Sequence, residues 1–354
     1  MRKFGAKLLE VLRKGDMVLL ALCVLTSVFG IVMVAASTAY DGSSRYVIIQ
    51  TGALITGILL YLALTAFDID ILAGQRTLLF LFNTAFLAML LVWGVEGTSG
   101  NKSWLHFPFL PFNIQPAEVC KITYIIILAK TMSLNRNRIS SLRSVGTLTF
   151  HMLWIVALIV VISHDTGVAL IFMFLFVVMA YVGGVSGWWS LIDPSIDPDG
   201  LGVLWQTNKS LEALRNGGLT GQGLFHGDLT SIGYLPAQHT DSIFSSIGEQ
   251  LGMLGCLAAL FLLLAIVLRC IQVGMKSPDY MNRLICIGIA SMLLFQILIN
   301  VGVCLGLFPV VGLALPFLSY GGSSILTSFL AMGIVSGIKM RPAPDMSAHY
   351  IRPY

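Results

Sequence analysis

At four points the sequence departs from its apolar pattern, three times through charged side chains and once through Gly and Pro, and the first is QPAEVCKITYIIILAK, residues 115–130. Glu118 and Lys121 are three residues apart there, a spacing that puts both on one face of a helix. Pro116 suits the first helical turn, and Glu118 suits its positive end. Because charges in hydrocarbon must be paired or face water, the pair is either a structural ion pair or the polar wall of a substrate cavity.

The second and third points follow further along the chain. Asp165 in SHDTG separates two apolar runs and is either a helix N-cap or part of a polar site. Asp241 and Glu249 in HTDSIFSSIGEQLG are eight residues apart, so both face one side if a helix already starts at Asp241. The structural alternatives are an N-cap for Asp241 and a helix-packing contact for Glu249.

The fourth point is NVGVCLGLFPVVGLALPFLSYGGSS, residues 300–324, in which Gly and Pro interrupt an apolar run. Irregular backbone at membrane depth is tolerated only where protein or water satisfies its polar groups. The segment therefore indicates a cavity, and close helix packing through small residues is the alternative.

The composition identifies the class of protein that must position these groups. The 354 residues are 56% hydrophobic and 11% charged, with mean hydropathy +0.87, whereas soluble domains carry about 25% charged residues. We expect an all-α polytopic integral membrane protein that forms one domain over residues 1–354. No basic stripe interleaved with aromatics points to nucleic acid, and the six cysteines lie in or near apolar runs, which predicts buried thiols without disulfides or a metal site.

Nine apolar stretches are long enough to cross a membrane, and the first is expected to be retained because no small-residue cleavage site follows the basic N-terminus. They are residues 17–37, 46–66, 77–94, 114–132, 145–163, 166–184, 250–269, 284–305 and 318–338.

The distribution of Lys and Arg predicts sidedness, since cytoplasmic loops are rich in these residues. The N-terminus, 135–143, 269–283 and the tail 339–354 are assigned to the cytoplasm, which leaves 38–45, 95–113 and a large loop at 193–245 outside. Two spans between Arg143 and Asp193 give the wrong parity. Either residues 183–192 help to form a short or re-entrant crossing, or one outside assignment is wrong.

These stretches, in this order, resemble the SEDS family (shape, elongation, division and sporulation), the RodA and FtsW type of cell-wall polymerase. The resemblance covers nearly the whole chain and is closer to RodA than to FtsW. Each motif alone is weak, but the ordered set is specific. The motifs are GNKSWL (100–105), IQPAEVCK (114–121), DPSIDPDG (193–200), GGLTGQGL (217–224), YLPAQHTDSIF (234–244), IGEQLGMLG (247–255), the segment 300–324, and Ser44-Arg45 with Gln50.

The resemblance implies a bundle of nine to ten helices in the bacterial cytoplasmic membrane with a large extracytoplasmic loop. It implies a peptidoglycan glycosyltransferase that polymerises lipid II, a disaccharide-pentapeptide on undecaprenyl pyrophosphate, at the outer face. The implied partner is a class B penicillin-binding protein, a transpeptidase, within the cell-wall elongation or division machinery. RodA-like character implies a role in elongation and cell shape.

Carried over residue by residue, the resemblance places the family's essential aspartate at Asp241 and its exposed arginine at Arg45. Its loop tryptophan falls on Trp104. Its Gln-Pro-Ser-Glu-x-x-Lys motif falls on Gln115, Pro116, Glu118 and Lys121, and its Asp-x-Gly motif on Asp165 and Gly167.

The sequence departs from the family pattern at several places. Ala117 replaces the usual Ser, Ser242 replaces the usual Phe, and SHDTGVA stands where Pro-Asp-x-Gly-Thr is common. The seventh of the family's ten spans, expected between Gly184 and Asp193, is missing or much shortened, which coincides with the parity conflict.

The expected chemistry needs a base for the acceptor hydroxyl and positive charge for the leaving pyrophosphate. Asp241 is the expected base, and the alternative is that it binds a divalent cation. Arg45, Lys102 and Lys121 are candidate pyrophosphate contacts, with Glu118 holding Lys121. Further members of the cavity are expected to be Trp104, Gln115, Asp165, Glu249, Ser319 and Ser323.

Two other functions fit parts of the sequence. Broken helices and charges at membrane depth also occur in transporters, so a flippase for a polyprenyl-linked precursor is the first alternative. We see no inverted repeat that relates the two halves of the chain. The second alternative is a non-catalytic scaffold that activates a penicillin-binding protein, which the shortened middle of the chain would favour.

Overall fold

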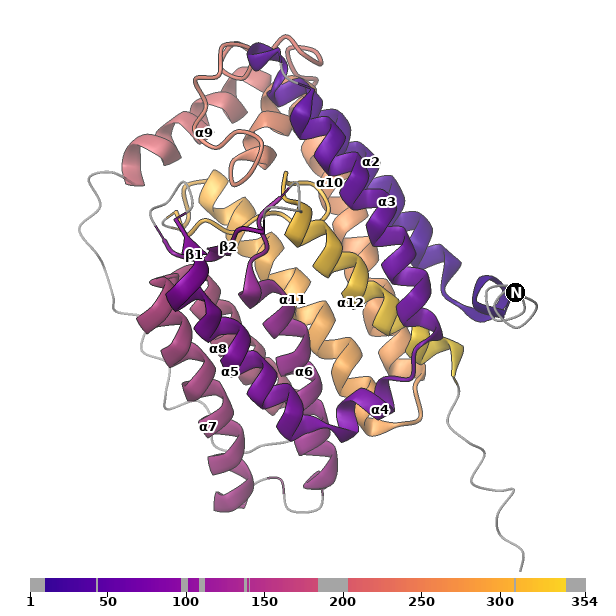
Figure 1. The fold of residues 1–354 in the computed structure, drawn as a ribbon. Helices are drawn as coiled ribbons and strands as arrows, with labels where there is room; N and C mark the ends of the chain where they lie inside the picture. Colours follow the sequence, from indigo (N-terminus) through magenta and orange to yellow (C-terminus); the bar gives the residue numbers. More distant parts are fainter. Residues whose placement is uncertain are drawn as a thin grey trace, which may run out of the picture.

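The computed structural model describes residues 10–42, 44–96, 101–107, 112–136, 139, 141–183, 203–308 and 310–341. These residues form a bundle of helices whose axes run broadly from the end near α4 (Ile69–Gly74) to the end near α9 (Val203–Gly217) (Figure 1). The long helices are α2 Met17–Ser37, α3 Arg45–Ala66, α5 Arg76–Trp93, α6 Pro116–Leu134, α7 Leu142–Leu158 with its π-helical continuation η3 Ile159–Ser163, α8 Thr166–Val182, α10 Ile243–Lys276, α11 Tyr280–Cys304 and α12 Gly322–Met340.

Each of the nine predicted stretches falls largely on a helix. Seven helical segments of the described chain are long and apolar enough to cross a membrane, and the shorter α8 and the more polar α6 account for the other two stretches. The expected start of the seventh stretch at residue 250 is wrong, because α10 begins at Ile243. Its first two turns are polar because they pack against the outer loop instead of lipid. The anomalous segment 183–192 lies outside the described residues, apart from Gly183.

The inner and outer helices differ in how much of their surface the bundle covers. In an apolar stretch of 18 residues from each helix, 78% of the residues are buried in α12 and 67% in α11, but only 22% in α5. Close approach of α12 to α3 depends on small residues: a Cβ at Gly57 would lie 2.8 Å from the Phe329 ring, and one at Gly333 2.9 Å from the Tyr61 carbonyl oxygen. Close packing through small residues is how membrane helices associate without a hydrophobic driving force.

One end of the bundle gathers basic groups around Asp16. The side chain of Asp16 is fully buried and pairs with Arg269 of α10 at 2.9 Å and Lys339 of α12 at 3.2 Å. The hydroxyl of Tyr61 in α3 donates to the Asp16 carbonyl over 2.7 Å. Segments predicted to be cytoplasmic therefore meet at one end, as the distribution of Lys and Arg requires.

The opposite end carries the large outer loop, of which the described part begins with α9. Residues 218–242 follow α9 as turns and lead into α10. A two-stranded hairpin, β1 Gly94–Val95 and β2 Trp104–Leu105, lies after α5 with Val95 opposite Trp104. A short helix, η1 Ala39–Asp41, joins α2 to α3.

Candidate active site at the outer end of the bundle

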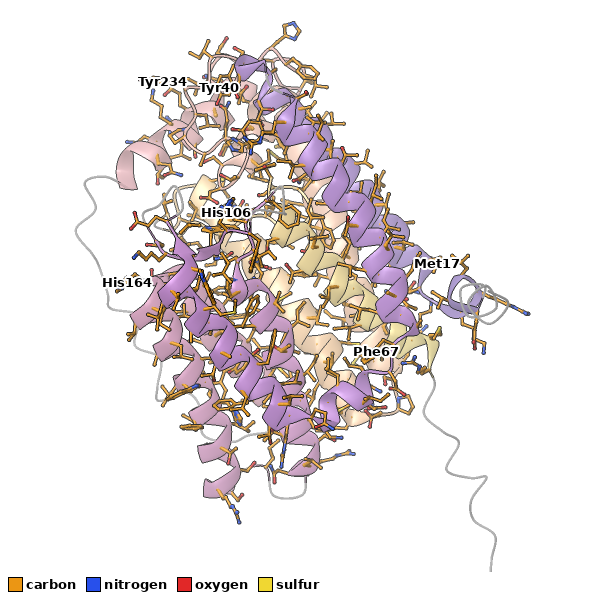
Figure 2. All side chains as sticks on the ribbon, viewed as in Figure 1. Met17, Tyr40, Phe67, His106, His164 and Tyr234 are labelled. Atoms are coloured by element: carbon orange, nitrogen blue, oxygen red, sulfur yellow. The ribbon has the colours of Figure 1, made fainter. Side chains whose placement is uncertain are left out.

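A polar cavity of about 650 Å³ opens among the outer ends of the helices. This volume lies in the range of small-molecule sites. In Figure 2, His106, which lines the cavity, lies between the bundle and the loop that carries Tyr234, far from Phe67 at the other end. Six of the predicted site residues line this cavity: Arg45, Trp104, Gln115, Glu118, Asp165 and Asp241.

Asp165 is held rigidly at the start of α8. Its Oδ1 accepts the N–H of Val168 over 3.0 Å, so it is an N-cap, as one prediction had it. Its Oδ2 nevertheless faces the cavity and accepts from Ser103 Oγ at 3.2 Å and Gln115 Nε2 at 3.5 Å. The two interpretations of Asp165 are therefore compatible. Burial outweighs these donors and raises the pKa of Asp165.

Asp241 enters the cavity from the loop just before α10. Its backbone is fixed, because Asn300 Nδ2 donates to its carbonyl oxygen over 2.9 Å and to that of Leu313 over 2.6 Å. Its carboxylate, by contrast, accepts no hydrogen bond from the described residues. Burial, with a smaller contribution from the negative charge of Asp165, raises the pKa of Asp241 to about 6. A carboxylate without donors, with a pKa near neutrality, is suited to proton transfer or to binding a ligand.

Glu118 and Lys121 form the ion pair that their spacing predicts, with 2.8 Å between Nζ and Oε1. Lys121 is fully buried, whereas 13% of the Glu118 side chain is exposed and lines the cavity. The pair is therefore both a structural ion pair and, through Glu118, a wall of the cavity. Pro116 occupies the first turn of α6, as expected.

Trp104 reaches the cavity from the hairpin above α6. Its neighbour Leu105 is fully buried and exchanges two backbone hydrogen bonds with Ile114, at 2.8 and 3.0 Å. These bonds tie the hairpin to the residue that precedes Gln115. The indole is thereby held over the start of α6.

The interrupted segment 310–321 forms the opposite wall with irregular backbone. Ser319 Oγ accepts the N–H of Leu315 and donates to the carbonyl of Thr240, both over 2.8 Å. Gln50 of α3 donates to the Ser319 carbonyl at 2.9 Å and accepts from Gly321 N–H at 3.1 Å. The cavity interpretation of this segment fits its position in the lining, and side chains satisfy the backbone that helix geometry leaves unpaired.

Glu249 does not line the cavity. Because α10 begins at Ile243, Asp241 is not on the helix, and the condition under which both carboxylates would face one side is not met. Glu249 instead accepts the backbone N–H groups of Leu229 at 2.8 Å and Thr230 at 2.9 Å. It anchors the outer loop, and its side chain is fully buried.

Four more predicted residues lie outside the lining. Lys102 is exposed, and Lys121 lies behind Glu118. Ser319 and Ser323 support the wall through hydrogen bonds, the latter accepting the N–H of Gln115 at 3.2 Å. Lys121, Ser319 and Ser323 therefore support the wall of the cavity from behind.

The sequence analysis did not single out several residues that line the cavity. Tyr46, His239 and Tyr320 form an aromatic group with ring centroids 4.9 to 5.6 Å apart. His239 and Tyr320 lie within the quoted motifs, and Tyr46 directly follows Arg45, so adjacency to a motif was the available signal. Burial lowers the pKa of His239, because it disfavours the charged imidazolium.

The charges in the lining are unequal. Glu118, Asp165 and Asp241 face Arg45, and no other Lys or Arg among the described residues lines the cavity. The described residues hold no cluster of three or more His, Cys, Asp or Glu side chains that could chelate a metal. A hard cation would therefore take one or two carboxylates from the protein, which is the usual manner of Mg²⁺.

Comparisons with known proteins assign the chain to a family. The family model for FtsW, RodA and SpoVE, described as “Cell cycle protein”, matches residues 16–193 and 188–343. A protein of Trichlorobacter lovleyi named “Probable peptidoglycan glycosyltransferase FtsW” is 32% identical, covering 96% of this chain and all of that protein. Stage V sporulation protein E of Bacillus subtilis is 29% identical over 91% of this chain and 96% of its own.

Solved structures show the same fold. The rod shape determining protein RodA of Thermus thermophilus superposes with a TM-score of 0.74 and 28% identity, covering 94% of this chain and 98% of that one. A chain from a peptidoglycan synthase complex, described as coordinating polymerization and crosslinking, gives 0.76 and 25% identity over 92% and 97%. The chain thus belongs to the FtsW, RodA and SpoVE family, the SEDS family of multi-pass proteins of the cytoplasmic membrane.

Proposed function

We propose that this protein is a peptidoglycan glycosyltransferase that polymerises lipid II at the outer face of the cytoplasmic membrane. The observation that carries the proposal is the Asp241 carboxylate, which lies in the outer cavity with a pKa of about 6 and accepts no hydrogen bond from the described part of the chain. The names of the relatives supply the reaction class: sequence relatives are called peptidoglycan glycosyltransferases.

In this proposal Asp241 takes the proton from the acceptor sugar hydroxyl as that oxygen attacks the anomeric carbon of the donor. The bond to the undecaprenyl pyrophosphate then breaks, and the pyrophosphate leaves with the electron pair. A pKa of about 6 leaves Asp241 mostly ionised at neutral pH yet basic enough to accept a proton. Trp104 and the aromatic group of Tyr46, His239 and Tyr320 offer flat surfaces against which sugar rings can pack.

The leaving pyrophosphate needs positive charge that the lining supplies only in part. Arg45 is in place for this role, but Lys121 is neutralised by Glu118, and Lys102 is exposed and does not line the cavity. With Glu118 paired to Lys121, the carboxylates of Asp165 and Asp241 face a single arginine, which favours the alternative in which a divalent cation enters with the substrate. Asp241 and Asp165 are the residues that would hold it, and the cation would offset charge on the pyrophosphate.

The cellular role is proposed from the names of the relatives. Relatives found by sequence include proteins named FtsW and stage V sporulation protein E, which favours division or sporulation over the elongation role expected from the motifs. The structural similarity to RodA leaves elongation as the alternative. The match to a synthase complex supports a class B penicillin-binding protein as partner.

The proposal is tested with the purified protein, its cognate class B penicillin-binding protein, lipid II, and a β-lactam to block transpeptidation. We expect glycan ladders from the wild type and none from Asp241→Asn, which keeps the shape of the side chain. The matched control is Asp228→Asn in the same outer loop, where the carboxylate is exposed and outside the cavity lining. Chelation with EDTA followed by Mg²⁺ separates the base role of Asp241 from the cation role.

Three results would overturn the proposal. Ladders from a pure Asp241→Asn preparation would remove Asp241 from the chemistry. An intact complex that makes no glycan with or without divalent cations would support the scaffold alternative, and transfer of labelled lipid across liposomes without glycan would support the flippase.

A further inference from the structure

A second polar cavity, of about 720 Å³, lies at the end of the bundle opposite the outer cavity. It opens between the first turns of α5 and α7 and the last turn of α6. Its charged lining residues are Arg76 and Arg143, both exposed, and no Asp or Glu is among the described residues that line it. The remaining lining residues are Thr77, Phe80, Thr131, Leu134, Asn135, Ser141, Ser144, Thr147 and His151.

Two helix N-termini point at this cavity. Arg76 and Thr77 begin α5, and Ser141, Arg143 and Ser144 form the start of α7. Free backbone N–H groups and the helix dipole make such ends favourable for anions. The opposing C-terminal end of α6 is capped, because Asn135 donates its backbone and side-chain N–H groups to the Thr131 carbonyl.

Buried hydroxyl groups without partners line the same cavity. Thr131 is 2% exposed and Ser144 4% exposed, and no described residue forms a hydrogen bond with the hydroxyl oxygen of either. The Nδ1 atom of His151 is likewise buried and unpaired. Since buried polar atoms in native proteins nearly always have a partner, two hydroxyls and an imidazole nitrogen facing one cavity indicate a ligand with several acceptor oxygens.

The surface next to the cavity is suited to lipid. Phe150 is 54% exposed, and its ring stacks on that of Trp154 with 6.1 Å between centroids. Trp154 donates its indole N–H to Thr84 Oγ1 over 3.0 Å, and Phe80 contacts the His151 ring at 5.1 Å. The aromatic strip of Phe80, Phe150 and Trp154 thus runs from the cationic cavity along the apolar faces of α5 and α7.

We propose that this cavity binds the phosphate headgroup of an anionic phospholipid from the cytoplasmic leaflet, with an acyl chain lying along the aromatic strip. Arg76 and Arg143 offset the phosphate charge, the hydroxyls of Thr131 and Ser144 donate to its oxygens, and the N-termini of α5 and α7 add their backbone dipoles. Basic pockets between helices on the cytoplasmic side are known to take such headgroups. The site is separate from the outer cavity and does not depend on the proposed polymerase activity.

The test compares lipid binding by native mass spectrometry on delipidated protein with phosphatidylglycerol and phosphatidylcholine. We expect phosphatidylglycerol to bind more tightly, and the double variant Arg76→Gln with Arg143→Gln to bind it about 30-fold more weakly, from about 1 kcal/mol for each charge removed. The matched control is Arg13→Gln, an exposed arginine near the same end of the bundle that is not in the cavity lining.

If the double arginine variant fails to fold, the double variant Thr131→Val with Ser144→Ala provides the test. It keeps both arginines and nearly the same side-chain volume, and removes only the two hydroxyl groups. That variant is expected to lose binding several-fold. Equal binding of the two lipids, or unchanged phosphatidylglycerol binding in these variants, overturns the proposal. The Tm is also measured with inorganic phosphate and with phosphatidylglycerol. If inorganic phosphate raises the Tm as much as phosphatidylglycerol does, the site binds a soluble phosphate and the proposal of a lipid ligand is overturned.

Discussion

At the scale of single residues, the outer cavity separates two carboxylates by their surroundings. Asp165 accepts hydrogen bonds from Val168 N–H, Ser103 and Gln115, whereas the carboxylate of Asp241 accepts none from the described residues. Asp165 is therefore fixed in position, and Asp241 is free to engage a ligand. The charge of Asp165 also helps to raise the pKa of Asp241, which makes Asp165 a positioning residue with an electrostatic effect.

Asp165→Asn is expected to shift the pH profile of glycan synthesis. Removing the negative charge lowers the pKa of Asp241 from about 6, so the fall in rate on the acid side moves to lower pH. Asn also serves as an N-cap, so α8 retains its first turn. The measurement is the initial rate of glycan formation between pH 5 and pH 8, where Asp228→Asn should keep the wild-type profile. An acid limb that stays near pH 6 in Asp165→Asn would contradict the coupling.

At the scale of elements, the outer loop forms backbone hydrogen bonds with α10 at a break in that helix. Gly252 has φ 67° and ψ −165°, a conformation essentially restricted to glycine, and it interrupts α10 after Gln250. The freed groups pair with the loop: Gly223 N–H donates to the Gln250 carbonyl at 3.0 Å, and Met253 N–H to the Gly218 carbonyl at 2.9 Å. Glu249 secures the next turn of the loop. The segment that carries Asp241 is thereby anchored to α10 on both sides of the break.

Gly252→Ala is expected to destabilise the protein by about 3 kcal/mol or more, because its Cβ would lie 2.4 Å from the Gly221 nitrogen in a conformation that L residues avoid. Gly52→Ala in α3 is the matched control, since its Cβ meets nothing within 4 Å and alanine favours the helix by about 0.5–1 kcal/mol. The measurement is the Tm of each variant in detergent. A Tm for Gly252→Ala equal to that of Gly52→Ala would show that the break is not required.

At the scale of the whole molecule, Asp16 joins helices from the two ends of the chain. Burial would raise the pKa of Asp16, but the hydrogen bonds from Arg269, Leu19 N–H and Lys339, with the charge of Arg269, lower it below 3.8. A carboxylate whose pKa is lowered on folding adds stability above its unfolded pKa and loses it as the pH falls through the folded value. The contact of α2 with α10 and α12 is therefore strongest at neutral pH.

Asp16→Asn is expected to lower the free energy of unfolding by about 1–3 kcal/mol at pH 7, less than for a dry pair because Arg269 and Lys339 are partly exposed. The difference from wild type should shrink below about pH 4. Tm values at pH 7 and at the lowest tolerated pH provide the measurement. The control is Lys14→Gln, which breaks only an exposed ion pair with Glu10 and should change neither Tm value. If the loss of Tm in Asp16→Asn is the same at both pH values, the ion pairs of Asp16 are not its cause.

The sequence by itself predicted the apolar helices, the end at which the basic segments gather, and the family. Twenty apolar residues must form a helix in lipid, and basic loops must stay inside, so the nine stretches and the cytoplasmic end followed from local composition. The Glu118–Lys121 pair followed in the same way, because a three-residue spacing fixes contact within one helix. Short-range physics also predicted the N-cap role of Asp165.

Only the tertiary structure decided which of the candidate residues share a cavity. Glu249 and Asp241 are neighbours in sequence, yet a helix that begins at Ile243 and breaks at Gly252 turns one toward the loop and leaves the other in the cavity. Tyr46 packs on His239, and Arg76 and Arg143 line one cavity. Both arrangements depend on contacts between distant segments, which local periodicity does not predict. The direction in which each of these side chains points depends on how the helices and loops pack, and this packing exists only in the folded chain.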